Sequence, residues 1–333
     1  MQALETKNSA PHIALIGGGS GSFTILQELR HFTPNISAIV NMSDDGGSTG
    51  RLRDEHGVLP PGDIRQCLVA LSKSDIARDI FDVRFSEGEL AGHSLGNMIL
   101  AGLEMKYGDF EQAVRTASTM LDVVGEVIPV TTTKHDLLMH DGSEVIRGES
   151  EIGHRKINST SAKVSHDPPA NLNPRAKNAI QSADIVAIAP GNLYGSLLPA
   201  LAVSGLSQAL QESKSRKVMI ANLVTKPGQT DGWHVVDYLK KIEEYVGANT
   251  VDTVLYNTEI PSKDLISKYA AEGEFTVDVI PEMFDVESAE YIGANLLASG
   301  IYMPNPADKA IKRTLIRHDA HVIGRQLMKL YYS

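Results

Sequence analysis

Residues 12–32 read HIALIGGGSGSFTILQELRHF, and the order of residue types in this stretch decides the fold. The run His12–Ile16 is short and apolar, a glycine-rich loop follows at once, and apolar residues then recur at helical spacing. This order predicts a strand, a loop and a helix. The loop, residues 17–22, would place backbone N–H groups at the helix start, where the helix dipole favours anions. Its candidate phosphate-binding residues are Gly18, Gly19, Ser20 and Gly21.

A nicotinamide-dependent enzyme is disfavoured by two departures from the dinucleotide-binding pattern. Ser22 stands where that pattern needs its third glycine. The next predicted strand, residues 37–40, ends in Asn41 rather than in the acid that would hold a nicotinamide ribose. The glycine loop by itself is therefore weak support for NAD binding.

A second polar stretch, Asn41–Arg53, reads NMSDDGGSTGRLR. Its acids offer the oxygen ligands that Mg²⁺ prefers, its glycines let N–H groups approach a ligand, and its arginines suit phosphate. Because parallel strands end at one edge of a sheet, this stretch and the glycine loop are predicted to face the same crevice. The alternative is a tight loop whose acids and arginines pair with each other. The candidates are Asp44, Asp45, Gly46, Gly47, Ser48, Arg51 and Arg53, with Asp45 as a Mg²⁺ ligand.

Two further glycine-rich turns precede predicted helices. In PPGDIRQCL, Asp63 is most simply a helix cap, with metal or substrate contact as the alternative, and Arg65 points to the crevice or to solvent. In GHSLGN, His93 and Asn97 suit phosphate donation or acid–base chemistry. The structural alternative for GHSLGN has Ser94 as a cap and the histidine simply packed.

A third strand–loop–helix unit follows the buried run Ile185–Ala189, with the loop sequence APGNLYGS. Gly191 and Asn192 would present polar groups at the edge where a parallel sheet binds ligands. Tyr194 would stack on a base or close the pocket. The alternative is an ordinary turn in which Asn192 caps the helix.

Between residues 126 and 170 the pattern changes to alternating apolar and polar residues, which predicts a β-hairpin excursion that turns at Asp141 and Gly142. The polar run Asn158–Ala170 is predicted to be a mobile loop that acts as a lid. A metal site built from histidines is disfavoured, because their spacing matches no zinc pattern. The histidines concerned are His135, His140, His154 and His166.

Strand-like runs alternate with helical ones along the rest of the chain, at residues 218–221, 251–257 and 275–280, before a last helix at residues 314–332. This alternation predicts an α/β fold that is Rossmann-like and doubly wound, with a mainly parallel sheet, helices on both faces and the small hairpin. With no linker in between, residues 11–333 are predicted to form one domain, behind a disordered tail of residues 1–10.

Composition narrows the class of protein. The chain of 333 residues is 42% hydrophobic, enough for a sizeable core, and its net charge of −10 argues against a binder of nucleic acid or acidic membranes. The single cysteine, Cys67, excludes an intrachain disulfide and is expected to be buried on a helix. No apolar run reaches membrane-spanning length. We expect a cytoplasmic protein without a membrane span.

Six motifs, taken in order, resemble the CofD-like family and its YvcK branch, the gluconeogenesis factors, over residues 13–317. They are GGGSGS, NMSDDGGSTGRLR, PPGDIRQCL, GHSLGN, APGNLYGSLLP and NLVTKPGQTDG. The resemblance implies one of two activities. Transferases of this family move a phospholactyl group from a guanosine diphosphate carrier with Mg²⁺. The YvcK branch resembles regulators of cell shape and cell-wall metabolism during gluconeogenic growth, which bind UDP-sugars such as UDP-N-acetylglucosamine.

The forms of GGSTGRLR and GHSLGN resemble the regulator branch, so the resemblance favours a UDP-sugar-binding regulator. It implies Tyr269 and Arg317 as residues that hold the nucleotide sugar, no required cofactor, Mg²⁺ as an optional ion, and unidentified cell-wall or regulatory proteins as partners. A homodimer is a fair expectation. The alternative is a Mg²⁺-dependent transferase with Asp44, Asp45 and His93 as catalytic residues. Ser20 and APGNLYGS depart from the usual regulator pattern, which leaves the exact ligand open.

Overall fold

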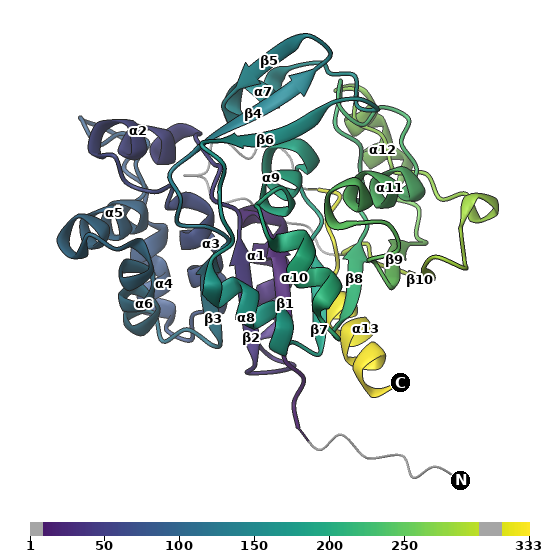
Figure 1. Ribbon diagram of the computed structural model, residues 1–333, viewed down its shortest axis with the longest axis horizontal. Helices are drawn as coiled ribbons and strands as arrows, with labels where there is room; N and C mark the ends of the chain where they lie inside the picture. Colours follow the sequence, from purple (N-terminus) through teal and green to yellow (C-terminus); the bar gives the residue numbers. More distant parts are fainter. Residues whose placement is uncertain (1–8, 300–314) are drawn as a thin grey trace.

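A seven-stranded sheet runs through the centre of the computed structural model, which describes residues 9–299 and 315–333 (Figure 1). Its neighbouring strands pair in parallel, in the order β10-β9-β8-β7-β1-β2-β3. The strands are β1 (Ile13–Gly17), β2 (Ile36–Val40), β3 (Glu126–Pro129), β7 (Ile185–Ile188), β8 (Arg216–Ile220), β9 (Thr253–Asn257) and β10 (Glu290–Ala294). The predicted parallel α/β sheet is confirmed.

The strand order reverses next to β1. From β1 the chain moves outward through β2 to β3, then crosses to the other side of β1 and moves outward from β7 to β10. The loops that leave β1 and β7 therefore diverge, and such a reversal is where open α/β sheets bind ligands. Every residue of β1, β2 and β7 is buried, which explains why these strands read as continuous apolar runs.

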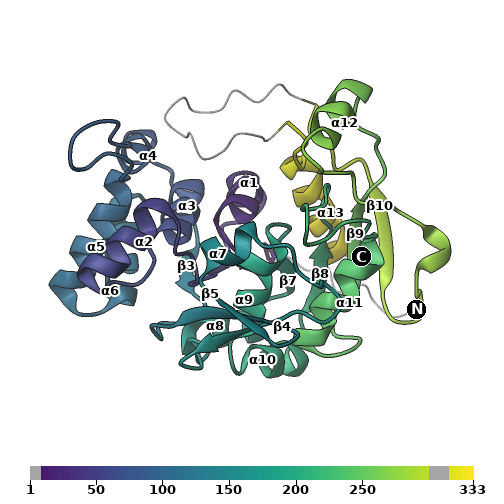
Figure 2. The same ribbon diagram turned by 90° about the horizontal axis from the view of Figure 1, so that it is seen from above.

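Helices cover both faces of the sheet. Their bounds are α1 (Gly19–Leu29), α2 (Gly47–His56), α3 (Gly62–Leu71), α4 (Asp75–Asp82), α5 (Leu95–Tyr107), α6 (Phe110–Met120), α7 (Glu149–His154), α8 (Pro174–Ser182), α9 (Leu198–Leu201), α10 (Leu206–Glu212), α11 (Val235–Val246), α12 (Lys263–Ala270) and α13 (Ala320–Tyr332), with a π-helical turn η1 (Leu193–Leu197) and a 3-10 turn η2 (Pro281–Met283). In the view from above, α3, α1 and α13 lie on one face, and α8, α10 and α11 lie on the other (Figure 2). One cluster of buried apolar side chains extends through the sheet and these helices.

A small antiparallel sheet lies beyond the carboxyl edge of the main sheet, at the top of Figure 1. Its order is β5-β4-β6, with β4 (Asp136–Asp141), β5 (Glu144–Arg147) and β6 (Lys163–Asp167). The predicted hairpin is confirmed as the β4–β5 turn. Two details were wrong. Residues 126–129 join the parallel sheet as β3, and residues 163–167 of the predicted mobile loop form β6, whose alternating buried and exposed side chains pair with β4.

Two predicted elements near the C-terminus also differ from the structure. Residues 275–280 make isolated bridges to the loop after β8 instead of a strand, and β10 is the outer strand. The last helix, predicted from residue 314, begins at Ala320, where the Asp319 side chain caps its first turn. Residue 314, like residues 1–8 of the predicted tail, lies outside the described residues.

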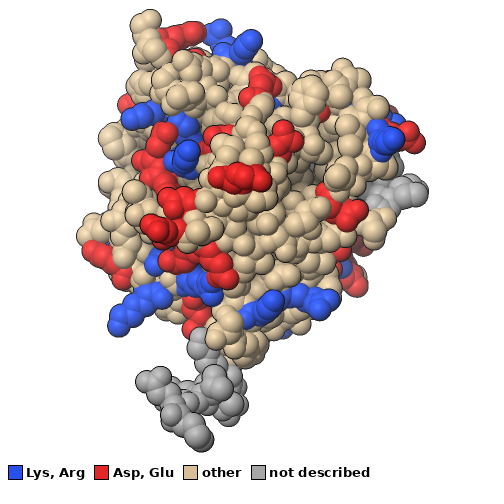
Figure 3. All heavy atoms as spheres, turned by 90° about the vertical axis from the view of Figure 1, so that its right-hand side faces the viewer, with Lys and Arg blue, Asp and Glu red and all other residues tan. Residues whose placement is uncertain are grey.

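Other expectations concern burial and charge. Cys67 is fully buried on α3, as expected. Among the described helices, none is both long enough and apolar enough to cross a membrane. On the face that forms the right-hand side of Figure 1, acidic and basic side chains are interspersed (Figure 3).

Candidate functional site

Loops from four neighbouring strands meet at the carboxyl edge of the sheet. These are the glycine loop after β1 and residues 41–46 after β2, 189–192 after β7 and 221–230 after β8. The glycine loop is shorter than predicted, because β1 ends at Gly17 and residues 19–21 already form the first turn of α1; we keep its name for residues 18–21. A Cβ on Gly21 would lie 1.9 Å from the carbonyl oxygen of Pro190, and one on Gly18 would lie 2.7 Å from the Cβ of Ser196. The glycine loop therefore packs directly against the loop after β7, at a distance that only glycine allows.

An acidic side chain already lies at the start of α1. Asp63 accepts a hydrogen bond from the backbone N–H of Gly19. Its oxygens are so close that a Cβ on Gly19 would lie 2.3 Å from the nearer one. The N-cap of α3 is Pro61, so the predicted cap role of Asp63 is wrong. The Asp63 carboxylate instead takes the position that a helix N-terminus offers to an anion.

The acids after β2 bind backbone N–H groups. We define residues 41–46 as the acid loop, because residues 47–53 of the predicted loop belong to α2. Both oxygens of Asp45 accept hydrogen bonds from the first turn of α7, from Glu149 at 2.9 Å and Ser150 at 2.8 Å. Asp44 accepts from the N–H of Gly46 at 3.0 Å. Asp45 therefore ties the acid loop to the small sheet, from which α7 follows.

Four carboxyl groups gather at this edge: Asp44, Asp45, Asp63 and Glu149. Burial raises the pKa of Asp44, and burial with the charges of Asp44 and Glu149 raises the pKa of Asp63 well above its usual value. Burial and the charges of Asp44 and Asp45 raise the pKa of Glu149 to about 7, against the opposing charge of Lys226. The mutual repulsion of these acids makes the site receptive to positive charge.

The residues present fit Mg²⁺ only in part. Asp44 and Asp63 are the hard oxygen donors that Mg²⁺ prefers. Within residues 9–299 and 315–333, however, no group of three or more histidine, cysteine or acidic side chains converges to hold a metal ion. Asp45, the predicted metal ligand, uses both oxygens to cap α7. A bound Mg²⁺ would therefore need phosphate and water oxygens to complete its shell.

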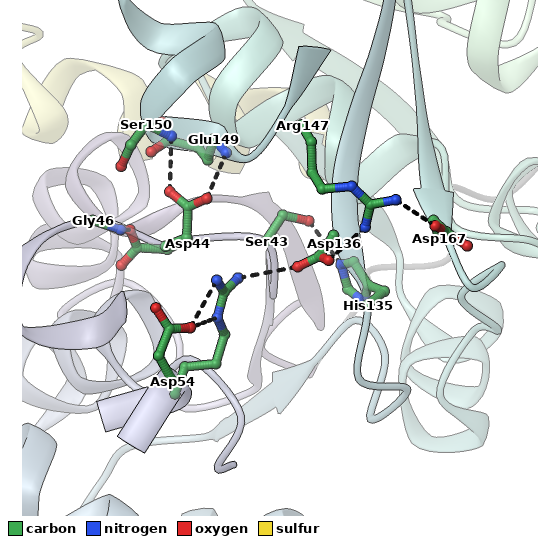
Figure 4. A network of polar contacts seen from close by, with 12 residues as sticks. Ser43, Asp44, Gly46, Asp54, His135, Asp136, Arg147, Glu149, Ser150 and Asp167 are labelled. Atoms are coloured by element: carbon green, nitrogen blue, oxygen red, sulfur yellow. Dashed lines mark hydrogen bonds and ion pairs between the residues drawn. The ribbon is translucent and has the colours of Figure 1, made fainter. Parts of the chain in front are cut away.

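The three arginines predicted to bind phosphate contact other groups. Their partners are the carbonyl oxygen of Ala91 for Arg51 (2.9 Å), Asp54 (3.0 Å) and Asp136 (3.6 Å) for Arg53, and Asn97 (3.1 Å) and Asp82 (2.5 Å) for Arg65. Asp136 also pairs with Arg147 of the small sheet, and Arg147 pairs with Asp167 (Figure 4). These contacts direct the guanidinium groups to neighbouring helices and strands rather than to the glycine loop.

His93, Ser48, Asn97 and Arg65 form a buried hydrogen-bonded group between α2, α3 and α5. The Ser48 hydroxyl lies 3.0 Å from Nδ1 of His93, and the Asn97 amide donates to that hydroxyl at 3.4 Å. Burial is the main cause that lowers the pKa of His93, which favours a neutral ring. Ser94 is the N-cap residue of α5 but makes no side-chain cap bond. The three sequence motifs that contain Ser48, Arg65 and His93 therefore meet in this buried group.

Asn192 caps the turn after β7, as its structural alternative proposed, and also joins two charged side chains. Its Oδ1 accepts hydrogen bonds from the N–H of Gly195 at 3.2 Å and from Nζ of Lys226 at 3.3 Å. Its Nδ2 donates to the Glu149 carboxylate at 3.4 Å. Tyr194 is fully buried and its hydroxyl donates to a backbone carbonyl before β6, so its ring packs in the core.

Tyr269 and Arg317 organise the segment that precedes α13. The Tyr269 hydroxyl accepts hydrogen bonds from the backbone N–H groups of Leu315 and Ile316, at 3.1 Å and 3.0 Å. Arg317 donates to the hydroxyl of Thr24 on α1 at 3.3 Å. These contacts bring the segment onto the helix that follows the glycine loop.

Two residues of this edge, Glu149 and Lys226, were missed as site candidates. Lys226 follows β8, so the rule that placed the other loops at one edge could have found it. Glu149 comes from the excursion, and no local signal connects it with the acid loop. The loop after β7 is held from the same side, since the N–H of Gly191 donates to Asn222 at 3.2 Å.

A cavity of about 260 Å³ lies beside the acid loop, towards the small sheet. Its lining residues are Met42, Arg53, Gly57, Val58, Leu59, Pro60, Lys134, His135, Asp136, Asp167 and Pro168. Nδ1 of His135 donates to the carbonyl oxygen of Thr133, so Nε2 accepts from the Ser43 hydroxyl at 2.9 Å. The ring of His166 lies edge-on to it at 4.4 Å, and burial lowers the pKa of His166 to about 4.

Comparison with known proteins places the chain in a family. The family profile described as "2-phospho-L-lactate transferase CofD" matches residues 13–297. The "Gluconeogenesis factor" of Bacillus subtilis is 37% identical over 96% of this chain and 98% of its own length. The "Gluconeogenesis factor" of Listeria monocytogenes is 34% identical over 97% of each chain.

A solved crystal structure has a similar fold. A crystal structure of a UPF0052 family member from Bacillus halodurans superposes with a TM-score of 0.87, at 34% identity, over 96% of this chain and 99% of that chain. The profile match covers the strands from β1 to β10 and the four loops at the carboxyl edge. The chain therefore belongs to the CofD family and is similar over almost its whole length to proteins named gluconeogenesis factors.

Proposed function

We propose that this protein binds a uridine-diphosphate sugar, of the UDP-N-acetylglucosamine type, at the carboxyl edge of its sheet. The observation that carries the proposal is the meeting of the glycine loop, the acid loop and the Asn192 turn beside the reversal in strand order. A diphosphate would receive backbone N–H groups at the start of α1. Tyr269 and Arg317, whose segment lies on α1, would flank the nucleotide.

The biological role that fits this ligand is regulation without turnover. The relatives over most of the chain are named gluconeogenesis factors. We propose that the protein acts in the cytoplasm as a sensor that reports nucleotide-sugar supply to cell-wall and cell-shape proteins during gluconeogenic growth. In this role Mg²⁺ is optional, and protein partners read the liganded state.

A second candidate, a Mg²⁺-dependent transferase, is favoured by two observations. The family profile is described by a transferase, and four carboxyl groups gather where a diphosphate leaving group would carry charge. Asp44 and Asp63 would hold Mg²⁺, which stabilises negative charge on a leaving group. The cavity beside the acid loop leaves room for a second substrate.

Calorimetric titration with UDP-N-acetylglucosamine and with guanosine diphosphate, each with and without Mg²⁺, separates the two candidates. The sensor predicts tight binding of the uridine ligand without Mg²⁺. Preference for the guanosine ligand, especially with a requirement for Mg²⁺, would contradict the sensor and favour the transferase.

A further inference from the structure

Lys226 lies where three parts of the site meet. It follows β8, it is half-buried, and its Nζ donates to Oδ1 of Asn192 in the turn after β7. The same Nζ lies 3.9 Å from the position of a Cβ on Gly153, so it also faces α7. Burial lowers the pKa of Lys226, whereas the charges of Glu149 and Glu274 raise it. The two acids therefore favour the charged form of Lys226 against the larger, opposite effect of burial.

Glu149 reaches the same point from the excursion. Its carboxylate accepts from Nδ2 of Asn192, and it lies so close to the turn that a Cβ on Gly195 would be 2.4 Å from its Oε1. One amide side chain therefore joins the two charges, with its oxygen on Lys226 and its nitrogen on Glu149. The backbone N–H of Glu149 is fixed in turn by Asp45.

The arginines of the conspicuous motifs are engaged at other places, as described above. We infer that Lys226 is the cationic side chain that a diphosphate meets at this edge, and that Glu149, joined to Lys226 through the Asn192 amide, supplies the negative charge that balances Lys226 until the ligand arrives. This inference rests on the proposed diphosphate site and names the side chains that it would use. Glu149 and Lys226 are then positioning and binding residues that were not candidates from the sequence, although Lys226 lies within the motif NLVTKPGQTDG.

Binding of a phosphate at Lys226 would also affect Glu149. When phosphate oxygens take the place of Asn192 Oδ1 at Lys226, the Asn192 amide that also holds the Glu149 carboxylate must shift. Glu149 is the first residue of α7, and α7 continues from the small sheet, so the displacement acts on the excursion. Ligand binding and the position of the small sheet are thereby coupled, and the coupling is reciprocal.

The test is calorimetric titration, without Mg²⁺, of wild type, Lys226→Met, Glu149→Gln and the double variant, with UDP-N-acetylglucosamine and with inorganic pyrophosphate as probes. Lys226→Met is expected to weaken binding by roughly 10- to 100-fold, because a charge-assisted contact to phosphate is lost. As a single variant, Glu149→Gln is expected to tighten binding several-fold. In the Lys226→Met background it should tighten binding by less than about twofold, because Glu149 competes with the ligand only through Lys226.

Matched controls separate this contact from a change in overall charge. Lys240→Met on the exposed side of α11 and Glu151→Gln on α7 make the same charge changes outside the crevice, and both should bind as wild type does. Lys226→Arg keeps the charge and is expected to retain most of the affinity. If Lys226→Met does not fold by circular dichroism, Lys226→Gln replaces it.

Three results of these titrations lead to different conclusions about the inference and the proposed function. Unchanged affinity in Lys226→Met, with wild type binding either probe, overturns the inference and leaves the proposed function standing. Binding of pyrophosphate alone, dependent on Lys226, supports the inference and contradicts the nucleotide sugar. Failure of wild type to bind either probe contradicts both.

Discussion

The glycine loop and the acid loop lie at the same edge of one sheet, yet they are held in different ways. The glycine loop is fixed by packing, since its Cα atoms lie against Pro190 and the Asp63 carboxylate. The acid loop is fixed by hydrogen bonds, since Asp45 caps α7 of the excursion. The first loop belongs to the rigid centre of the fold, whereas the second joins that centre to a separate small sheet.

The largest effect should come from filling the contact at the glycine loop. Gly21→Ala places a methyl group on the backbone carbonyl of Pro190, which cannot yield without moving the loop after β7. We expect a loss of about 1–3 kcal/mol in the free energy of unfolding, measured by chemical denaturation. Gly102→Ala is the control, because Gly102 lies exposed on α5 with open space around it, and should raise stability by about 0.5–1 kcal/mol. Equal stability of Gly21→Ala and wild type would show that close packing does not fix the glycine loop.

A smaller effect is expected at the acid loop. Asp45→Ala removes both acceptors from the first turn of α7 and should lower the free energy of unfolding by about 1–2 kcal/mol. Hydrogen exchange should quicken at Glu149 and Ser150 more than in β1. Asp54→Ala is the control, since Asp54 lies exposed on α2, where its carboxylate pairs with the neighbouring Arg53. Unchanged exchange in α7 would show that Asp45 does not tie the two parts together.

The smallest effect is a pH dependence. The pKa of Glu149 is raised to about 7 by burial and by Asp44 and Asp45, so the folded state holds a proton that the unfolded state has lost above about pH 4.5. This group therefore lowers stability as pH rises from about 4.5 to about 7. Glu149→Gln should match wild type near pH 4 and exceed it at pH 8 by on the order of 1 kcal/mol. If the difference in the free energy of unfolding between Glu149→Gln and wild type does not change from pH 4 to pH 8, the raised pKa of Glu149 is contradicted. Glu151→Gln, measured over the same range, is the control.

The parts of the molecule that could be predicted are those with local signals. The run from His12 to Ser22 predicts a strand, a loop and a helix start because each has its own residue types, and parallel pairing then places the loops after β2 and β7 at the same edge. The hairpin turn at Asp141 and Gly142 was visible for the same reason. Local chemistry thus determined most of the sheet.

The remaining features depend on contacts between distant residues. Arg53 suits phosphate in the sequence, but it pairs with Asp54 and with Asp136, which lies more than eighty residues away. Glu149 enters the site only because α7 packs on Asp45, and Asp63 takes up the N–H of Gly19 rather than capping its own helix. Residue type indicates what a side chain is able to bind, whereas the tertiary fold selects which partner it meets.

The Asp63 carboxyl group at the N-terminus of α1 limits which ligands are able to bind there. Because Asp63 already accepts from the N–H of Gly19, a small anion that offers nothing beyond its charge gains little by replacing it. A ligand must bring further contacts, to other loops or to a cation, before it displaces or joins this acid. At the proposed ligand site we therefore expect free phosphate to bind more weakly than a larger molecule that spans several loops at once.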